Sequence, residues 1–339
     1  MESTAAKLQP VSGGTMATAE TTYLRTELEV RRQRLLDATR AQTANASLRE
    51  LLSNVDAALA RLNAGTFGIC EQCHDSIEAD RLITDPLVRF CLDHLSQDEQ
   101  RALEKDLALA AGIQRALLPR PDWSVDGWQA RYHYQPANVV SGDYCDLIES
   151  NGGFLFLLGD VAGKGVAASM LMSHLHATFR TLARQQLPLR SLMGHANRLF
   201  CESTTAGQFA TMIVGNAKPD GKVEYISAGH LPLFHISRSG ICPRAATGVP
   251  LGMFSSTEYD ICQLQLDPGD KLFLYTDGLT EVFNSAGVEF GLERVRSLAT
   301  RHTADHPQAM ITACLDEISS FSPAKRTDDL TMLVLHRSH

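Results

Sequence analysis

The chain has 339 residues, 44% of them hydrophobic, and its 31 basic and 39 acidic side chains leave a net charge of −8. This length predicts two or three domains, and the acidic balance argues against general nucleic-acid binding. No apolar run approaches the roughly 20 residues that a membrane-spanning helix needs. Residues 1–20 are small and polar and lack a hydrophobic signal segment. We therefore expect a disordered tail there and a cytoplasmic protein.

Residues 21–66 carry two stretches with apolar residues at helical spacing, separated by the polar break ATRAQTANAS. The second stretch has steps of three and four residues through Leu48, Leu52, Val55, Leu59 and Leu62. Such a seam is typical of a coiled coil or of a helix that covers a core. Three arrangements stay open from the pattern: a helical hairpin, a dimerising coiled coil, or two helices packed on a larger domain.

Residues 67–95 contain two pairs of metal-ligand residues, Cys70 with Cys73 and Cys91 with His94. Each pair can present two ligands from a tight turn to one tetrahedral ion, and thiolates with an imidazole favour zinc. With all four positions filled by the protein, the site is expected to be structural. Zinc would then supply much of the folding free energy of so short a segment.

Residues 57–98 resemble the DksA/TraR-type zinc finger in the opening GTFGICEQC and in the closing RLITDPLVRFC. His94 stands where the commonest pattern of that family has a fourth cysteine. The resemblance implies a zinc finger preceded by helices. In that family the helical hairpin has an acidic tip that reaches into RNA polymerase, whereas the polar break in this chain has no acidic pair.

Apolar residues at helical spacing continue through residues 96–118, which predicts a linker helix that ends before Pro119. This helix either covers a core or couples an input module to the large domain at 119–339. Strand-like runs in that domain are 131–134, 154–158, 209–214, 223–226, 231–236, 259–266, 271–275 and 330–335, and helix-like stretches are 167–182, 189–201, 292–301 and 307–321. Several runs follow one another through Gly-containing turns, which favours antiparallel sheets covered by helices, an α+β architecture.

Four acidic clusters in the large domain border strand-like runs: Asp143 in SGDY, Asp160 in LGDVAGKG, Asp277 in LYTDGLTE, and Asp328 with Asp329 in RTDDLT. We expect all of them in turns at strand ends. A single Asp beside Gly is more often a turn residue than a ligand. Four such turns in one domain, however, are what two neighbouring cations need, because carboxylates offset the repulsion between them. Oxygen ligands without Cys or His favour Mg or Mn over zinc.

The order of motifs in this domain resembles the SpoIIE/RsbU branch of the metal-dependent (PPM) serine/threonine protein phosphatases. The matching motifs include VSGDYCD, LGDVAGKGVAASMLM, YISAGHLPLF, PGDKLFLYTDGLTEVFN and TDDLTMLVL. The resemblance covers about residues 110–337. It implies a PPM-phosphatase sandwich of two antiparallel sheets flanked by helices, with a dinuclear Mn/Mg site at one end.

The resemblance also implies a ligand set for two Mn²⁺ or Mg²⁺ ions. These ligands are Asp143, Asp160, the carbonyl oxygen of Val161, Asp277, Asp328 and, as a lesser candidate, Asp329. Asp160 is the expected bridge between the two ions. The predicted catalytic set is Asp143, Asp160, Asp277 and Asp328. Asp146 is expected to be structural. Lys164 is interpreted as a solvated loop lysine and His230 as a residue that orders a loop.

The leading hypothesis is an Mn/Mg-dependent protein serine/threonine phosphatase that uses a metal-activated water and carries one structural Zn²⁺. The resemblance implies a phosphorylated STAS-domain anti-anti-sigma protein as substrate. We expect a homodimer through the N-terminal helices, with the finger as an input or dimerisation module, no membrane partner and no direct nucleic-acid binding. The alternative is a zinc-finger regulator of RNA polymerase with an inert phosphatase-like domain, against which the complete set of acidic clusters argues.

Overall fold

The protein is described here from a computed structural model, which covers residues 18–41, 46–78, 81–82, 85–95, 97–150, 152–205, 207–323 and 326–338. Residues 1–17 of the expected tail lie outside this part. The chain divides into two compact units, Met1–Lys105 and Asp106–His339. Within the described ranges, no helix combines the length and the hydrophobicity needed to cross a bilayer.

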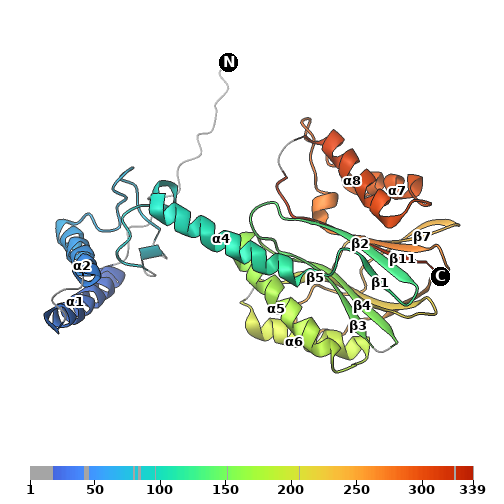
Figure 1. Ribbon diagram of the computed structural model, residues 1–339, viewed down its shortest axis with the longest axis horizontal. Coiled ribbons are helices and arrows are strands. Elements are labelled where there is room, and N and C mark those ends of the chain that lie inside the picture. The colour runs from blue at the N-terminus through green and yellow to red at the C-terminus, as the bar shows by residue number, and fades with distance from the viewer. Residues whose placement is uncertain are drawn as a thin grey trace, which may run out of the picture. The chain divides into compact units, whose positions relative to one another are not determined.

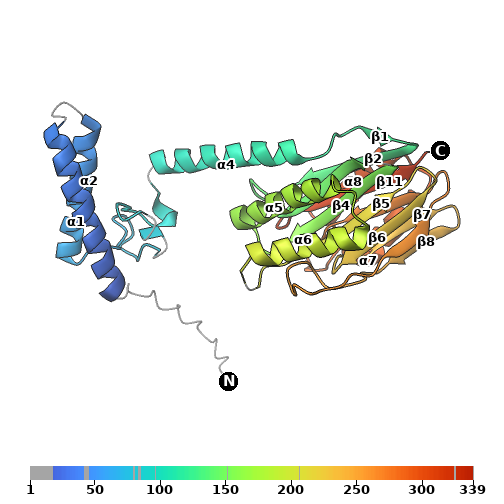
Figure 2. The ribbon, with the colours of Figure 1, turned by 90° about the horizontal axis from the view of Figure 1, so that it is seen from below.

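The first unit begins with a helical hairpin of α1 (Thr18–Ala41) and α2 (Ala46–Ala64), which lie side by side (Figure 1, Figure 2). Leu28 of α1 is buried against Val55, Ala58 and Leu62 of α2. The apolar seam predicted in the second helix therefore closes a hairpin within one chain, because neither helix alone can bury its apolar face.

A small finger follows the hairpin and ends in the short helix η1 (Leu92–His94). A β-bridge between Ile69 and Ser76 holds its first turn. Its buried core consists of Cys70, Ile77, Leu82, Val88 and Cys91. Phe67 packs against this core and against the core of the hairpin, so that the two parts form one unit.

The second unit contains two antiparallel sheets. The strands of the first sheet, in spatial order, are β1 (Trp123–Val125), β2 (Trp128–Gln135), β11 (Leu330–Arg337), β10 (Lys271–Tyr275), β7 (Leu233–Ser237) and β8 (Gly240–Arg244). Those of the second are β3 (Asp143–Ser150), β4 (Gly153–Val161), β5 (Ala210–Ala217), β6 (Lys222–Ala228) and β9 (Cys262–Gln265).

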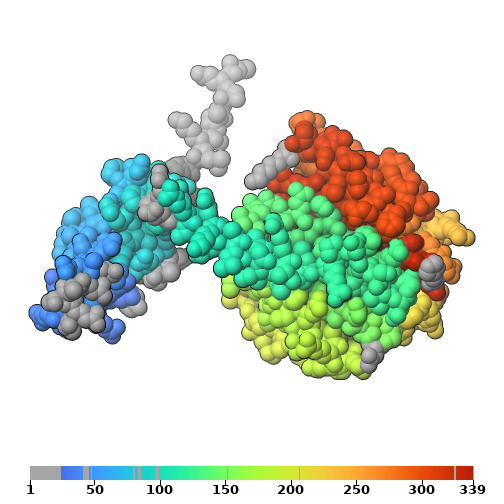
Figure 3. Space-filling model, viewed as in Figure 1, coloured from blue at the N-terminus to red at the C-terminus, as the bar shows by residue number. Residues whose placement is uncertain are grey.

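Helices cover the outer face of each sheet. The second sheet is covered by α5 (Gly165–Ala183) and α6 (Leu189–Ser203), and the first by α7 (Gly291–Arg301) and α8 (Pro307–Phe321). Figure 3 shows these pairs on opposite flanks, α5 and α6 in yellow-green and α7 and α8 in red. The helix α4 (Gln97–Leu117) matches the predicted linker helix. The predicted α+β sandwich of antiparallel sheets flanked by helices is confirmed.

The strand β4 shows why the sequence around it is continuously apolar. Phe154, Phe156 and Leu158 belong to the core between the sheets, whereas Leu155 and Leu157 belong to the core under α5 and α6. Because successive residues of a strand point to opposite faces, a strand buried on both faces must be apolar at every position. The buried strand predicted at 154–158 is confirmed by this arrangement.

One expectation about the neighbouring segment is wrong. Asp143, Asp146 and Asp160 were expected in turns. Asp143 and Asp146 lie in β3, which pairs with β4 along its whole length, and Asp160 lies in β4 itself. The polar residues hide β3 from pattern analysis. They are tolerated inside it because the buried Asp146 forms an ion pair with the half-exposed Arg180 of α5, with N–O distances of 2.6 and 2.8 Å. This pair also fixes α5 onto the sheet.

Candidate active site

The first two acidic residues of the site come from the paired strands β3 and β4. Asp143 and Asp160 are direct partners in the strand register. Side chains of directly opposed residues point to the same face of a sheet and lie close together. The strand pairing by itself therefore brings together two carboxylates that are 17 positions apart in the sequence.

Asp143 is only 1% exposed, and its two carboxylate oxygens differ. Its Oδ2 accepts hydrogen bonds from the hydroxyl groups of Thr276, at 2.9 Å, and Thr331, at 2.5 Å. Its Oδ1 has no hydrogen-bond partner among the described residues. Burial, and then the charge of Asp160, raise the pKa of Asp143 well above its usual range. A buried carboxylate with one unused oxygen is a group that a cation would satisfy.

A second acidic group comes from the first sheet. The short helix η2 (Asp277–Leu279) follows β10, and Asp328 precedes β11. Oxygens of Asp277, Glu281 and Asp328 all lie within 4.8 Å of one another. Burial and the charges of Asp328 and Glu281 raise the pKa of Asp277 to about 6. Burial and the charges of Asp277 and Asp328 raise the pKa of Asp160 to about 8, which ties the two acidic groups together.

Glu281 was missed by the sequence analysis. It lies one helical turn after Asp277, and its amide donates a 2.7 Å hydrogen bond to the carbonyl oxygen of Asp277. Residues spaced by four in a helical turn lie on the same side. The spacing Asp-x3-Glu in TDGLTE was the signal available, and it identifies Glu281 once the turn after β10 is taken as helical.

Two glycines let these segments approach one another. A Cβ atom at Gly278 would collide with the carbonyl oxygen of Asp329, so that η2 can lie against the entrance to β11 only with glycine there. A Cβ atom at Gly142 would lie 3.0 Å from the carbonyl oxygen of Val161 and 3.4 Å from Oδ1 of Asp160. The Val161 carbonyl, predicted as a ligand, therefore faces the same narrow space as the Asp160 carboxylate.

Asp329 is buried and uses both carboxylate oxygens within the protein. Oδ1 accepts a 2.7 Å hydrogen bond from the amide of Ala137, and Oδ2 accepts a 2.9 Å bond from the amide of Gly142. These bonds hold the segment that leads into Asp143. The contacts are those of a residue that positions the loop.

Two further polar residues border the carboxylates. Lys164 donates to Oδ2 of Asp328 at 2.8 Å and to the carbonyl oxygen of Thr327 at 2.9 Å, so it is held in place although exposed. His230 contacts the hydroxyl of Thr211 at 2.8 Å through Nδ1, and its Nε2 lies 3.2 Å from the carbonyl oxygen of Tyr275. Burial lowers the pKa of His230 to about 4, so its ring is neutral at pH 7.

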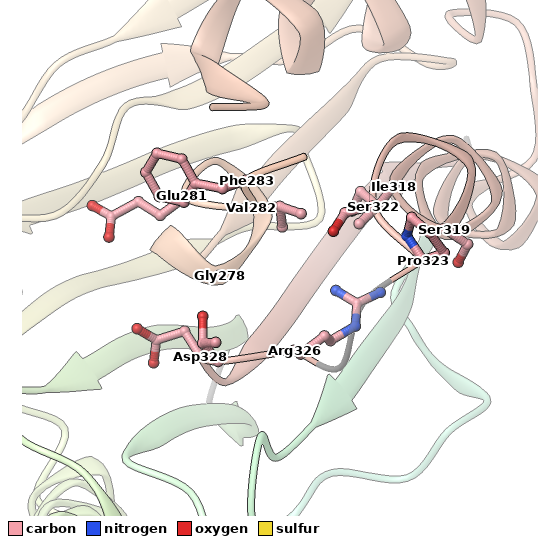
Figure 4. A pocket seen from close by; sticks show the side chains of 11 residues that line it. Gly278, Glu281, Val282, Phe283, Ile318, Ser319, Ser322, Pro323, Arg326 and Asp328 are labelled. Carbon is pink, nitrogen blue, oxygen red and sulfur yellow. The ribbon is translucent and has the colours of Figure 1, made fainter. Parts of the chain in front are cut away.

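Two cavities adjoin the acidic residues. One, of about 260 Å³, is lined by Asp160, Thr211, Gly229, His230, Leu231, Pro232, Asp277 and Glu281. The other, of about 310 Å³, shares Glu281 with the first and is also lined by Gly278 and Asp328 (Figure 4). The carboxylates therefore stand at the floor of an accessible site, which has room for a phosphate group and part of the chain that carries it.

A separate cluster in the finger contains the four predicted zinc ligands. Ligand atoms of Cys70, Cys73, Cys91 and His94 lie within 4.8 Å of one another. The sulfur atoms of Cys73 and Cys91 are 3.7 Å apart, close to the edge of about 3.8 Å that a tetrahedron with Zn–S bonds of about 2.3 Å has. Burial opposes ionisation of Cys70, but backbone amides, with that of Cys73 first, outweigh it and lower the pKa of its thiol to about 6. The donor set fits zinc.

Two antiparallel sheets between helices, with carboxylates gathered at one end, define a PPM-type phosphatase fold. The model of the family "Stage II sporulation protein E (SpoIIE)" matches residues 150–338, more than half of the chain, and the chain belongs to this family. The model of the prokaryotic dksA/traR C4-type zinc finger matches residues 65–93, so the finger is of that type. Both resemblances noted in the sequence motifs are thereby confirmed.

Relatives and solved structures agree with this assignment. The chain is 27% identical to phosphoserine phosphatase RsbU of Bacillus subtilis (strain 168), a match that covers 70% of this chain and 72% of RsbU. It is 26% identical to protein IcfG of Synechocystis sp., covering 67% of this chain but only 40% of IcfG. The SiaA-PP2C domain of Pseudomonas aeruginosa superposes with a TM-score of 0.62 at 18% identity, covering 72% of this chain and 99% of that domain, which shows the fold.

Proposed function

We propose that the protein is a divalent-cation-dependent phosphatase that hydrolyses phosphoserine or phosphothreonine on a regulatory protein. The observation that carries this proposal is the convergence of Asp143, Asp160, Asp277 and Asp328 at one end of the two sheets. Burial, and then their mutual repulsion, raise the pKa values of Asp143, Asp160 and Asp277, and bound cations would offset both effects. All donors are oxygens, which favours Mn or Mg. The name of the relative RsbU, a phosphoserine phosphatase, supports the same reaction.

Within this proposal, two cations would be held by Asp160, shared between them, together with Asp143, the carbonyl of Val161, Asp277 and Asp328. Bound cations would supply an activated water at neutral pH and would offset the charge of the phosphoryl group. Glu281 joins the set because it lies with Asp277 and Asp328. Asp329 has both oxygens engaged by backbone amides, so we place it among the residues that hold the loop rather than among the ligands.

The surrounding residues orient these groups. Thr276 and Thr331 hold one oxygen of Asp143 and leave Oδ1 free to face a cation. Lys164 fixes Asp328 and adds positive charge at the rim of the site. His230 is neutral at pH 7, and the proton on Nε2 is directed at the Tyr275 carbonyl. We therefore assign His230 a role in shaping the cavity rather than in protonating the leaving group.

We propose that the finger holds one structural zinc ion through Cys70, Cys73, Cys91 and His94, and that the N-terminal unit serves as an input or dimerisation module. The substrate that the resemblance of the sequence motifs implies is a phosphorylated STAS-domain protein. Asp143 lies opposite Asp160, and Asp277 lies with Asp328 and Glu281, so none of the predicted carboxylates is missing. This favours an active enzyme over an inert domain attached to a regulator of RNA polymerase.

The test is hydrolysis of a phosphoserine peptide and of p-nitrophenyl phosphate by the full chain while Mn²⁺ is titrated. We expect saturable dependence on Mn²⁺, and we expect Asp160→Asn to lose both Mn²⁺ binding and turnover. Asp267→Asn, an exposed carboxylate remote from the cluster, is the matched control and should behave as wild type. Turnover that is independent of divalent cations, or that survives Asp160→Asn, would refute the proposal.

A further inference from the structure

The larger of the two cavities is lined by several residues to which the reaction described above gives no role. One of its walls is apolar and is formed by Val282, Phe283, Ile318 and Pro323, while Ser319, Ser322 and Arg326 provide polar groups (Figure 4). Phe283 is 55% exposed, so an aromatic ring stands at the rim of this cavity. Because Glu281 and Asp328 also line it, the cavity adjoins the proposed metal ligands directly.

Arg326 is the unusual residue of this cavity. Its Nη1 atom is buried and has no hydrogen-bond partner within the described ranges of the chain. Asp328, two residues further along, is paired with Lys164 instead. Burial lowers the pKa of Arg326, but an arginine stays protonated in proteins. A partly buried cation that lacks a counter-ion is costly, and an anion supplied from outside would remove this cost.

The side chains that line the cavity define two separate places where anionic groups of a substrate could bind. In Figure 4 the carboxylates of Asp328 and Glu281 both extend to the left side of the cavity, whereas the guanidinium of Arg326 lies on the right, below Ser322 and Pro323. The phosphate of a substrate belongs at the carboxylate end, where the cations would bind. Arg326 therefore lies where a second anionic group of the same substrate would reach it, away from the carboxylates.

A neighbouring residue of a peptide chain is well placed to supply this group. An extended chain advances about 3.3–3.6 Å per residue, so a side chain one or two positions from the phosphoserine reaches the adjoining cavity. A carboxylate can accept two parallel hydrogen bonds from a guanidinium, which gives geometric selectivity as well as energy. The apolar wall would contact the methylene groups of a Glu side chain.

We propose that this cavity is a specificity subsite that binds an acidic side chain flanking the phosphorylated residue, with Arg326 as its anchor. This inference rests on the proposed phosphatase function and adds to it the chemical class of the substrate. A phosphoprotein with Glu or Asp next to its phosphoserine fits the site. One with Lys or Arg at that position does not.

The experiment compares two phosphoserine peptides that differ only in Glu or Gln beside the phosphoserine, with the full chain in Mn²⁺. We expect wild type to prefer the Glu peptide about tenfold in kcat/KM, mainly through KM, which corresponds to about 1.4 kcal/mol from the hydrogen-bonded charge pair. Arg326→Gln should abolish the preference, and Arg326→Lys should keep part of it. Arg326→Glu should favour a third peptide that has Lys beside the phosphoserine. The control Arg296→Gln, an exposed arginine of α7, should retain the preference.

The outcomes separate this inference from the proposed function. If wild type hydrolyses both peptides with equal kcat/KM, the subsite is refuted while the phosphatase function stands. If Arg326→Gln slows both peptides and p-nitrophenyl phosphate by the same factor, Arg326 acts at the reacting phosphate and the subsite is again refuted. If wild type hydrolyses no phosphoester, the proposed function itself fails. Should Arg326→Gln not fold, the wild-type preference and Arg326→Lys decide the question.

Discussion

The finger and the phosphatase unit both gather side chains that suit metal ions, but they do so over very different lengths of chain. The finger takes its four donors from residues 70–94, and its buried core is only a few residues. The phosphatase unit takes its carboxylates from residues 143–328, and two sheets with three large apolar clusters hold them. A zinc ion would supply much of the folding free energy of the finger. In the phosphatase unit, the packed sheets hold the mutually repelling carboxylates together even without a bound metal.

This difference between the two regions predicts opposite changes in stability when a metal ligand is removed, and these changes can be measured. Removing a zinc ligand should destabilise the finger, because thiolates and zinc supply most of what holds it together. Removing a carboxylate from the other cluster should stabilise the metal-free phosphatase unit, because it removes repulsion that burial has made costly. The same kind of substitution is thus expected to act in opposite directions in the two regions.

The largest effect is expected in the finger. Structural zinc contributes about 10–16 kcal/mol of apparent binding free energy in finger peptides, so Cys91→Ala should leave residues 67–95 unfolded. We expect zinc content to fall from one ion per chain to none, and amide hydrogen exchange to become fast in the finger but to stay slow in β11. Cys201→Ala, a thiol of α6, should change neither quantity. Slow amide exchange in the finger of a variant that binds no zinc would contradict the idea that zinc keeps the finger folded.

Asp277→Asn provides the opposite case. We expect Mn²⁺-dependent turnover to fall by about 10³-fold, since metal-ion catalysis supplies several kcal/mol of transition-state stabilisation. In buffer that retains zinc but lacks Mn²⁺ and Mg²⁺, we expect the variant to unfold at a higher temperature than wild type at pH 8. The reason is that the pKa of Asp277 is raised to about 6, so its ionised form is the costly one in the folded state. A lower unfolding temperature for Asp277→Asn than for wild type would show that repulsion between the carboxylates does not destabilise the metal-free site.

His230 predicts the pH dependence of stability in the phosphatase unit. Its pKa lies at about 4 in the folded protein against a usual value of about 6.5. The unfolded chain therefore binds more protons between these values, and stability is lost as pH falls from about 6.5 to 4. Over this range the free energy of unfolding of wild type should fall by up to about 3 kcal/mol more than that of His230→Gln. The contributions of carboxylates common to both proteins cancel in this difference. A difference in unfolding free energy that does not change with pH would contradict the lowered pKa of His230.

The smallest effect is expected where α4 meets the segment before Asp143. Gln114 is buried, donates to the carbonyl oxygen of Ser141 at 2.7 Å, and accepts from the Ser141 amide at 3.0 Å. Gln114→Ala should lower kcat/KM up to about tenfold and weaken Mn²⁺ binding, because it leaves this backbone without its partners. Glu104→Ala, at an exposed position of the same helix, is the control. Equal activity of the two variants would show that α4 does not position the site.

Much of the finger could be predicted from sequence because its determinants are local. Two pairs of ligands at short spacing need only tight turns to converge, and the structure brings Cys70, Cys73, Cys91 and His94 together as the spacing indicated. In the phosphatase unit, the motifs identified Asp143, Asp160, Asp277 and Asp328 as candidates. They did not show that Asp143 begins a strand, because its polar neighbours break the apolar pattern.

The sequence by itself determined the family, the α+β sandwich and the residue types that a zinc site and an oxygen-ligand site require. Only the tertiary structure decided which groups meet. Strand register set Asp143 opposite Asp160, and a glycine let η2 reach the entrance to β11 and brought Glu281 into the cluster. The buried Nη1 atom of Arg326 was left without a hydrogen-bond partner among the described residues. The physical reason is that these partners are joined by sheet pairing and packing between distant segments, which no local pattern encodes.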